Sequence, residues 1–551
     1  MKSNGGKGVN IASEVSIENF ANSGTITSNS IAIDVANNSN INYFTNSGFI
    51  SAGKGVNIGQ GSMTNFTNAS GGTIQGIEAG VLINTKIDTF TNNGFINSIG
   101  KSAQWSNGVW VSGNTNVKTF VNNGIMQGDT GAIRSSGGTI ENFINNGIMN
   151  SGYTTMFIQN SIIKTLENKG TINTTQDISW GAAIKLEEGG TIENIINTGT
   201  INSITSGIYV SYGRFETLTI KDGGIVYGKT AGIRVGQWQS LGDLYIDGTS
   251  SKKDGTVSGI YSDNFGISLD ESSKTQKIEL TNGGVIKGNI SGIRLDNGAS
   301  LSGEMILSGE GSRVEGGSGS GISNQSGKIE GSITVKDGAT VTSSSGQAIS
   351  NSGSGSITGG ITVSGENTKL EGNIINADSA SIGSDIKIEG GAKVEGGLVN
   401  QGNGSISGSV QVSGGSSIDS ITNEGNGAIS GSITVDKDSK LDSITNTSTS
   451  DTGISGSITN NSDNKLEISN SGNIGGKIES TGAADMVISN NGGGTISGGI
   501  SSSGSGNTSI SNSQGSTINN GITVSGSAQV EISNQGSVGK DENGNTVTNN
   551  G

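Results

Sequence analysis

The sequence predicts an all-β fold, a single-stranded parallel β-helix of about 21 coils with three short strands in each coil. Three observations predict it. An Ile, Phe, Asn and Gly pattern recurs every 20–30 residues or so, and short Gly-led strands recur with it. None of the 551 residues is Pro. Since Pro cannot donate to a hydrogen-bond ladder, a chain of stacked strands excludes it.

The pattern is clearest in IENFINNGIM, which runs from Ile140 to Met149. Its anchor residue recurs at intervals of 22 to 30 residues along the first part of the chain. The anchors are Phe20, Phe44, Phe66, Phe90, Phe120, Phe143, Leu166 and Ile195. Strand alternation turns the anchors inward, so we expect them to stack inside the coil.

An Asn residue follows each anchor by two positions and precedes a turn. These residues are Asn22, Asn46, Asn68, Asn92, Asn122, Asn145, Asn168 and Asn197. Asn tolerates left-handed backbone, and stacked amides can bond to one another along the axis of a solenoid. The eight Asn residues are therefore expected to form one structural ladder at a corner of the coil.

The Gly-led strand, for example GVNI at residues 55–58, points alternate side chains outward. Coil by coil, the predicted outward column is Asn10, Asp34, Asn57, Leu82, Trp110, Arg134, Ile158, Lys185, Tyr209, Arg234, Ser268 and Arg294. Exposed aromatic side chains beside Arg are typical of binding surfaces. The candidate ligand-binding residues are Trp110, Arg134, Lys185, Tyr209 and Arg234. The alternative is that a loop or a neighbouring aromatic residue, such as Trp105, Tyr212 or Trp238, covers them.

The chain changes character near residue 265, which predicts an aromatic-containing β-helix over residues 1–265 and an aromatic-free continuation over residues 266–551. All Phe, Trp and Tyr residues lie in the first part. In the second part a leaner pattern of Ile and Val recurs, as in Ile329, Ile333 and Val335. The alternative is a flexible Gly/Ser linker, but linkers do not keep Ile at fixed intervals.

Composition limits the chemistry of the chain. It has no Cys and no His, so thiolate metal sites and Ser-His or Cys-His nucleophiles are excluded. We expect no metal and no cofactor, because Asp541 to Asn545 lacks the Gly spacing and distal Glu of a calcium loop. The net charge of -15 argues against nucleic acid as a partner. Lys118, Glu141, Lys164 and Glu193 alternate in sign in successive coils and are expected to form a charge ladder.

The IENFxNxGxI and GGITV repeats, in a Cys-free chain of low charge, resemble the β-helical passenger region of a Gram-negative autotransporter (type V secretion). The resemblance implies a non-enzymatic rod, an adhesin or stalk, at the cell surface, in the outer membrane or secreted. It implies a glycan or a protein on a cell surface as partner, or self-association. Membrane attachment is expected only through a C-terminal barrel, which this chain does not include. The alternative is a β-helical enzyme that processes polysaccharides, either a lyase or a tailspike-like hydrolase.

Overall fold

The computed structural model describes residues 1–3, 5–101, 106–249, 257–527 and 529–550. Within these residues every regular element is a β-strand, and the strands form a parallel β-solenoid of about 22 coils. The predicted fold class is thus confirmed. The chain divides into two compact units, residues 1–275 and residues 276–551. The predicted boundary at residue 265, which rests on the loss of aromatic residues, stays a prediction.

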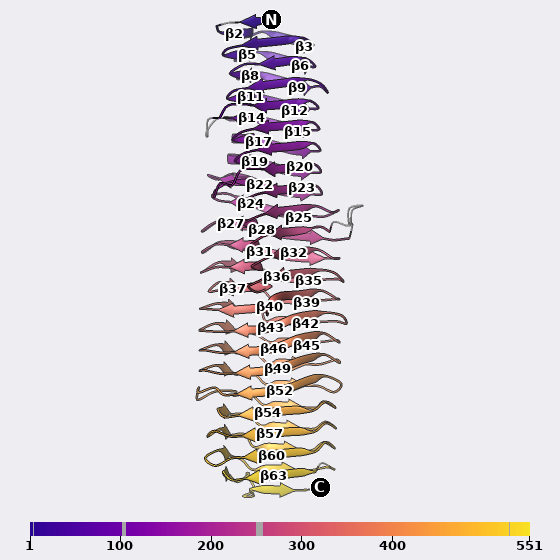
Figure 1. Cartoon of the computed structure of the whole chain (residues 1–551), viewed down its shortest axis with the longest axis vertical. Helices are drawn as coiled ribbons and strands as arrows, with labels where there is room; N and C mark the ends of the chain where they lie inside the picture. Colours follow the sequence, from indigo (N-terminus) through magenta and orange to yellow (C-terminus); the bar gives the residue numbers. More distant parts are fainter. Residues whose placement is uncertain (4, 102–105, 250–256, 528, 551) are drawn as a thin grey trace. The chain divides into compact units, whose positions relative to one another are not determined.

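Unit 1, residues 1–275, has three strands in each coil and therefore three parallel sheets. Figure 1 shows its strands stacked coil upon coil. The first sheet contains β2 (Lys7–Ile11), β5 (Ile31–Val35), β8 (Lys54–Ile58), β11 (Ala79–Ile83), β14 (Asn107–Ser112), the first parts of β17 (Gly131–Asn145) and β19 (Thr154–Asn168), β21 (Ala182–Glu187), β24 (Ser206–Val210), β27 (Ala231–Val235) and β30 (Phe265–Leu269).

The second and third sheets follow the first sheet in every coil. The second contains β3 (Ser16–Asn22), β6 (Asn40–Asn46), β9 (Ser62–Asn68), β12 (Lys86–Asn92), β15 (Asn116–Asn122), the later parts of β17 and β19, β22 (Thr191–Asn197), β25 (Arg214–Ile220) and β28 (Ser240–Asp247). The third contains β1 (Lys2–Ser3), β4 (Thr25–Ser28), β7 (Phe49–Ser51), β10 (Thr73–Gly76), β13 (Phe95–Ser98), β16 (Ile125–Gly128), β18 (Ile148–Ser151), β20 (Thr171–Thr174), β23 (Thr200–Ser203), β26 (Ile225–Gly228) and β29 (Gly259–Ser262).

Two side-chain stacks run along the interior of unit 1, beside the buried Ile, Val, Leu and Met residues of the core. Adjacent Phe rings from Phe20 to Phe143 lie nearly parallel, with centroids 4.4 to 5.2 Å apart. Each predicted Asn from Asn22 to Asn168 donates an amide hydrogen bond of 2.7 to 2.9 Å to the next Asn. The turn after this ladder needs Gly, because a Cβ on Gly147 would lie 2.1 Å from the Gly124 carbonyl oxygen.

Unit 2, residues 276–551, has an Asn ladder of its own, which was not predicted from the sequence. Ten Asn residues bond in series over 2.7 to 3.0 Å. They lie on β37 (Ile322–Gln325), β40 (Thr340–Ser352), β43 (Lys369–Asn376), β46 (Lys393–Asn400), β49 (Ser417–Asn423), β52 (Lys440–Asn446), β54 (Leu466–Asn470), β57 (Met486–Asn490), β60 (Thr508–Asn512) and β63 (Val530–Asn534).

The other strands of unit 2 are short. One set, between the Asn turn and the next corner, is β34 (Ser300–Leu301), β38 (Lys328–Ile329), β41 (Ser356–Ile357), β44 (Ser381–Ile382), β47 (Ser405–Ile406), β50 (Ala428–Ile429), β55 (Asn473–Ile474), β58 (Thr495–Ile496), β61 (Thr517–Ile518) and β64 (Ser537–Val538). A second set is β35 (Met305–Ser308), β39 (Ile333–Lys336), β42 (Ile361–Ser364), β45 (Ile386–Glu389), β48 (Val410–Val412), β51 (Ile433–Val435), β53 (Ile458–Asn460), β56 (Ile478–Ser480), β59 (Ile500–Ser502), β62 (Ile522–Val524) and β65 (Val547–Asn549). The remaining strands are β32 (Val285–Gly288), β33 (Ser291–Leu295) and β36 (Arg313–Gly316), and β31 (Lys274–Thr281) contains the unit boundary.

Candidate functional site

The outer face of the first sheet in unit 1 carries a column in which aromatic and cationic side chains alternate. The members are Trp110, Arg134, Phe157, Lys185, Tyr209 and Arg234, and the sheet register pairs each with the next. We call these six residues the cation-π column. Neighbouring strands lie about 4.8 Å apart, so each side chain contacts the one above and the one below it.

Every cation in the column lies against at least one aromatic ring. The Arg134 guanidinium carbon is 5.7 Å from the Trp110 ring centroid and 5.0 Å from that of Phe157. The Lys185 ammonium is 5.7 Å from Phe157 and 5.8 Å from Tyr209, and Arg234 is 5.0 Å from Tyr209. Each such contact contributes roughly 0.5–2 kcal/mol, more where water is excluded.

Phe157 occupies the outward position that the sequence pattern predicted for Ile158, so the prediction for Ile158 is wrong. The register pairs Arg134 with Phe157 and Ile133 with Met156, and Met156 and Ile158 are buried in the core. The strand here reads TTMFI and lacks the leading Gly that aligned its neighbours, so the sequence pattern was misaligned by one residue. A one-residue slip exchanges the two faces of a strand.

Lys185 is only 5% exposed, so its ammonium is held inside the column. It lies 5.3 Å from the Trp180 ring centroid, and it forms an ion pair of 3.3 Å with Glu187. Trp110, Arg134, Tyr209 and Arg234 are half-buried and reach the surface. Trp180, on the turn before β21, is 46% exposed and extends the aromatic surface beside Lys185.

A neighbouring aromatic residue covers one member of the column, because Trp180 lies against the buried Lys185. Tyr212 and Trp238 are both strongly exposed, and Trp105 lies outside the described residues. Neighbouring polar side chains fix the orientation of two members of the column. The Trp110 indole donates to Ser136 over 2.8 Å, and Arg134 donates to the Gln159 side-chain oxygen over 2.8 Å.

Carboxylates around the column accept hydrogen bonds from nearby side chains. Gln159 donates to Glu188 over 2.6 Å, and Arg234 Nε donates to Asp270 over 2.8 Å. Burial lowers the pKa of Arg134, while the charges of Glu187 and Glu188 act in the opposite direction. A guanidinium stays protonated in either case. The column therefore presents fixed cations between aromatic rings.

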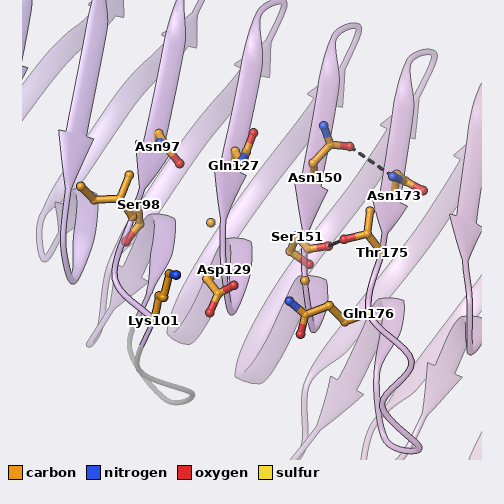
Figure 2. Close-up of a pocket in the computed structure, with 13 residues that line it drawn as sticks. Asn97, Ser98, Lys101, Gln127, Asp129, Asn150, Ser151, Asn173, Thr175 and Gln176 are labelled. Atoms are coloured by element: carbon orange, nitrogen blue, oxygen red, sulfur yellow. Dashed lines mark hydrogen bonds between the residues drawn. The ribbon is translucent and has the colours of Figure 1, made fainter.

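A second feature of unit 1 is a groove of about 480 Å³ along the end of the third sheet. Figure 2 shows Asn97, Gln127, Asn150 and Asn173 in a row across neighbouring strands, with Lys101, Asp129 and Gln176 nearer the turns. Asn173 donates to Asn150 over 3.5 Å within this row. The sequence analysis did not identify these residues. Their signal was an uncharged polar residue directly after the buried residue of each third-sheet strand.

The predicted charge ladder is not formed as expected. Lys118 forms an ion pair of 2.6 Å with Asp88 rather than with Glu141, and the hydrogen bond and charge of Asp88 raise the pKa of Lys118. Glu141 instead accepts a hydrogen bond from Asn116 over 3.3 Å. Among the described residues no ion pair joins Glu141 to Lys118 or Lys164. Lys118 lies on a strand between those of Asp88 and Glu141, so a carboxylate is available on each side and Asp88 takes the ion pair.

The Asp541 turn uses its carboxylate internally. The Asn545 and Asn543 backbone amides donate to it over 2.7 and 2.9 Å, and Thr548 donates over 3.1 Å. The Asn545 backbone hydrogen bond is the largest of the effects that lower the pKa of Asp541. Within the described ranges there is no cluster of three or more acidic residues placed to hold a metal ion.

The fold and the two surfaces define the class of the molecule: a parallel β-solenoid with an aromatic and cationic column on one face of unit 1 and a polar groove on another. No protein-family model matches the chain, and no curated protein matches it either. In the part of the chain that the structure describes, a helix that is apolar and long enough to cross a membrane is not found.

Proposed function

We propose that the protein is a non-catalytic β-solenoid of the autotransporter-passenger type, displayed at the surface of a Gram-negative bacterium or secreted from it. Its role is that of an adhesin or stalk that attaches to a host cell or a neighbouring cell. The cation-π column is the observation that carries this proposal. Trp, Tyr and Arg are the residue types that contribute most to binding at protein surfaces.

The geometry of the column supports binding rather than a purely internal role. Trp110 and Tyr209 present their rings on the outer face, and their positions are fixed by the cations that pack against them. Side chains that are already ordered lose little conformational entropy when a partner binds. The fixed cations also suit a partner that carries acidic groups.

The alternative is an enzyme that processes polysaccharides, which requires two or three carboxylates, or a set of Lys and Arg residues, that converge in a groove. Among the described residues that line the third-sheet groove, Asp129 is the one carboxylate. The carboxylates beside the column are held by Lys185, Gln159 and Arg234. These contacts favour the binding function over the catalytic one.

The test uses the whole chain, labelled with a fluorophore, on cultured epithelial cells and on Gram-negative bacteria. We expect saturable binding to at least one of these surfaces. Polysaccharides incubated with the unlabelled chain should keep their length, as measured by size-exclusion chromatography. If the chain shows saturable binding to none of the cell types, the proposal is contradicted. If polysaccharides are shortened, the result supports the enzyme instead.

A further inference from the structure

The third sheet of unit 1 differs from its neighbours in having no charged residue after its first strand, β1, which contains Lys2. None of the strands β4, β7, β10, β13, β16, β18, β20, β23, β26 and β29 contains Asp, Glu, Lys or Arg. The other two sheets carry both signs, for example at Lys118 and Glu141 on the second and Arg134 and Glu187 on the first. Exposed apolar residues bordered by polar residues are typical of interaction sites, so the outward residues of this face are of interest.

The outward residues of the third sheet form two parallel columns. The first is apolar in its middle coils, where Phe49, Phe95, Ile125 and Ile148 are joined by Thr residues. Ile125 and Ile148 are 39% and 42% exposed. The second is the amide column, Gln75, Asn97, Gln127, Asn150, Asn173 and Asn202. The two columns are about 6.6 Å apart, two residues along each strand.

The amide column leads into the groove of Figure 2, where one buried atom has no hydrogen-bond partner among the described residues. Asn97 lines this groove and is only 8% exposed. Its Oδ1 accepts no hydrogen bond from any described residue. An unsatisfied buried acceptor costs roughly as much as a lost hydrogen bond, and a rotation of the Asn97 side chain toward the groove would let this oxygen accept a hydrogen bond from a ligand.

From these observations we infer that the third-sheet face and its groove bind a neutral, extended glycan that runs along the solenoid axis. The amide row repeats once per coil, about every 4.8 Å, and a repeating surface suits a repeating polymer. An amide both donates and accepts hydrogen bonds, as a sugar hydroxyl does. Ile125 and Ile148 would pack against the apolar faces of the sugar rings, while hydroxyls reach Gln127 and Asn150.

This inference adds a second surface to the proposed adhesin and can fail independently of the cation-π column. The test measures the affinity of the whole chain for neutral polysaccharides (amylose, dextran, xylan and galactomannan) and for the charged polysaccharides alginate and heparin. We expect binding to at least one neutral polymer and much weaker binding to the charged ones. A Trp110→Ser/Tyr209→Ser variant should keep this affinity even where it no longer attaches to cells.

The diagnostic variant is Gln127→Ala/Asn150→Ala, which removes two neighbouring amides from the row. We expect the Kd to rise about tenfold or more, since at least two hydrogen bonds are lost. The matched control is Asn123→Ala/Asn146→Ala, in the same two coils. Those amides are exposed and bond to each other over 2.8 Å, away from the groove. The control should bind as the wild type does.

Several outcomes would overturn the inference. They are no binding to any neutral polysaccharide, preference for the charged polymers, or equal affinities of wild type and Gln127→Ala/Asn150→Ala. Sedimentation velocity tests a second copy of the chain as occupant of the same face. A dimer that dissociates in the Gln127→Ala/Asn150→Ala variant, without any glycan binding, would assign the face to self-association instead.

Discussion

The Arg134 guanidinium carbon lies 5.0 Å from the ring centroid of Phe157, one coil further along unit 1. This contact joins Trp110 on one side to Lys185 and Tyr209 on the other, so the column is continuous. A binding surface built this way depends on contacts between its own residues as well as on contacts with a partner.

A double-mutant cycle measures the Arg134–Phe157 contact. We expect Arg134→Met and Phe157→Leu each to lower the free energy of unfolding, and the two effects to be coupled by about 0.5–2 kcal/mol. Chemical denaturation followed by Trp fluorescence gives the values. Strictly additive effects would show that the two side chains are adjacent but do not stabilise one another.

Asn145 tests the Asn ladder of unit 1. It is fully buried, accepts from Asn122 and donates to Asn168, both over 2.8 Å. Asn145→Ala leaves the Asn168 oxygen without its donor, and we expect a loss of about 2–4 kcal/mol. Because a solenoid is stabilised coil by coil, hydrogen exchange should show the loss concentrated in the coils around residues 120–170.

The neighbouring residue provides the control for the ladder. Asn146 is exposed and donates to Asn123 over 2.8 Å, so Asn146→Ala should change the free energy of unfolding by no more than about 0.5 kcal/mol. If Asn145→Ala and Asn146→Ala cost the same, burial of the amide row would not be what stabilises the turn.

The contacts of Glu315 predict that the stability of unit 2 falls at acidic pH. Burial opposes its ionisation, but hydrogen bonds from Lys287 (2.7 Å) and Arg313, with their charges, outweigh burial and bring its pKa below the ordinary value of 4.5. The carboxylate therefore stabilises the fold fully above pH 4.5. This contribution is lost as the pH falls through the lowered pKa.

The variant Glu315→Gln should remove this part of the acid dependence and cost roughly 1 kcal/mol at pH 7. Thermal unfolding between pH 3 and pH 7 compares it with the wild type. Glu330→Gln, in the exposed pair with Lys328, is the control and should have little effect. If stability depends on pH in the same way in the wild type and in Glu315→Gln, the ion pairs of Glu315 do not contribute to stability.

The sequence was sufficient to predict the fold class because Phe20, Asn22 and Gly24 recur together and each has one structural task. In unit 2 the Asn residues, such as Asn400 and Asn423, lack an aromatic anchor beside them. They stand instead two positions after Leu398 and Ile421, a weaker signal among many other Asn residues. The ladder there became evident only from hydrogen bonds between coils.

The candidate sites were predictable to different degrees. Trp110, Arg134, Lys185, Tyr209 and Arg234 could be aligned because Gly-led strands gave their register, whereas Phe157 could not. The groove could not be derived from a period alone, because it depends on how the corner residues Lys101, Asp129 and Gln176 turn beside the third sheet. Side-chain direction at a corner is a property of the folded backbone rather than of the repeat.

The most direct test of the account is the affinity of two paired variants for the cell surface that the wild type binds. Trp110→Ser/Tyr209→Ser removes two rings of the cation-π column, and Tyr212→Ser/Trp238→Ser removes two exposed rings outside it. We expect the first variant to lose about tenfold or more in affinity, with its folding intact by circular dichroism, and the second to bind as the wild type does. Unchanged binding of the column variant, or an equal loss in both, would contradict the account.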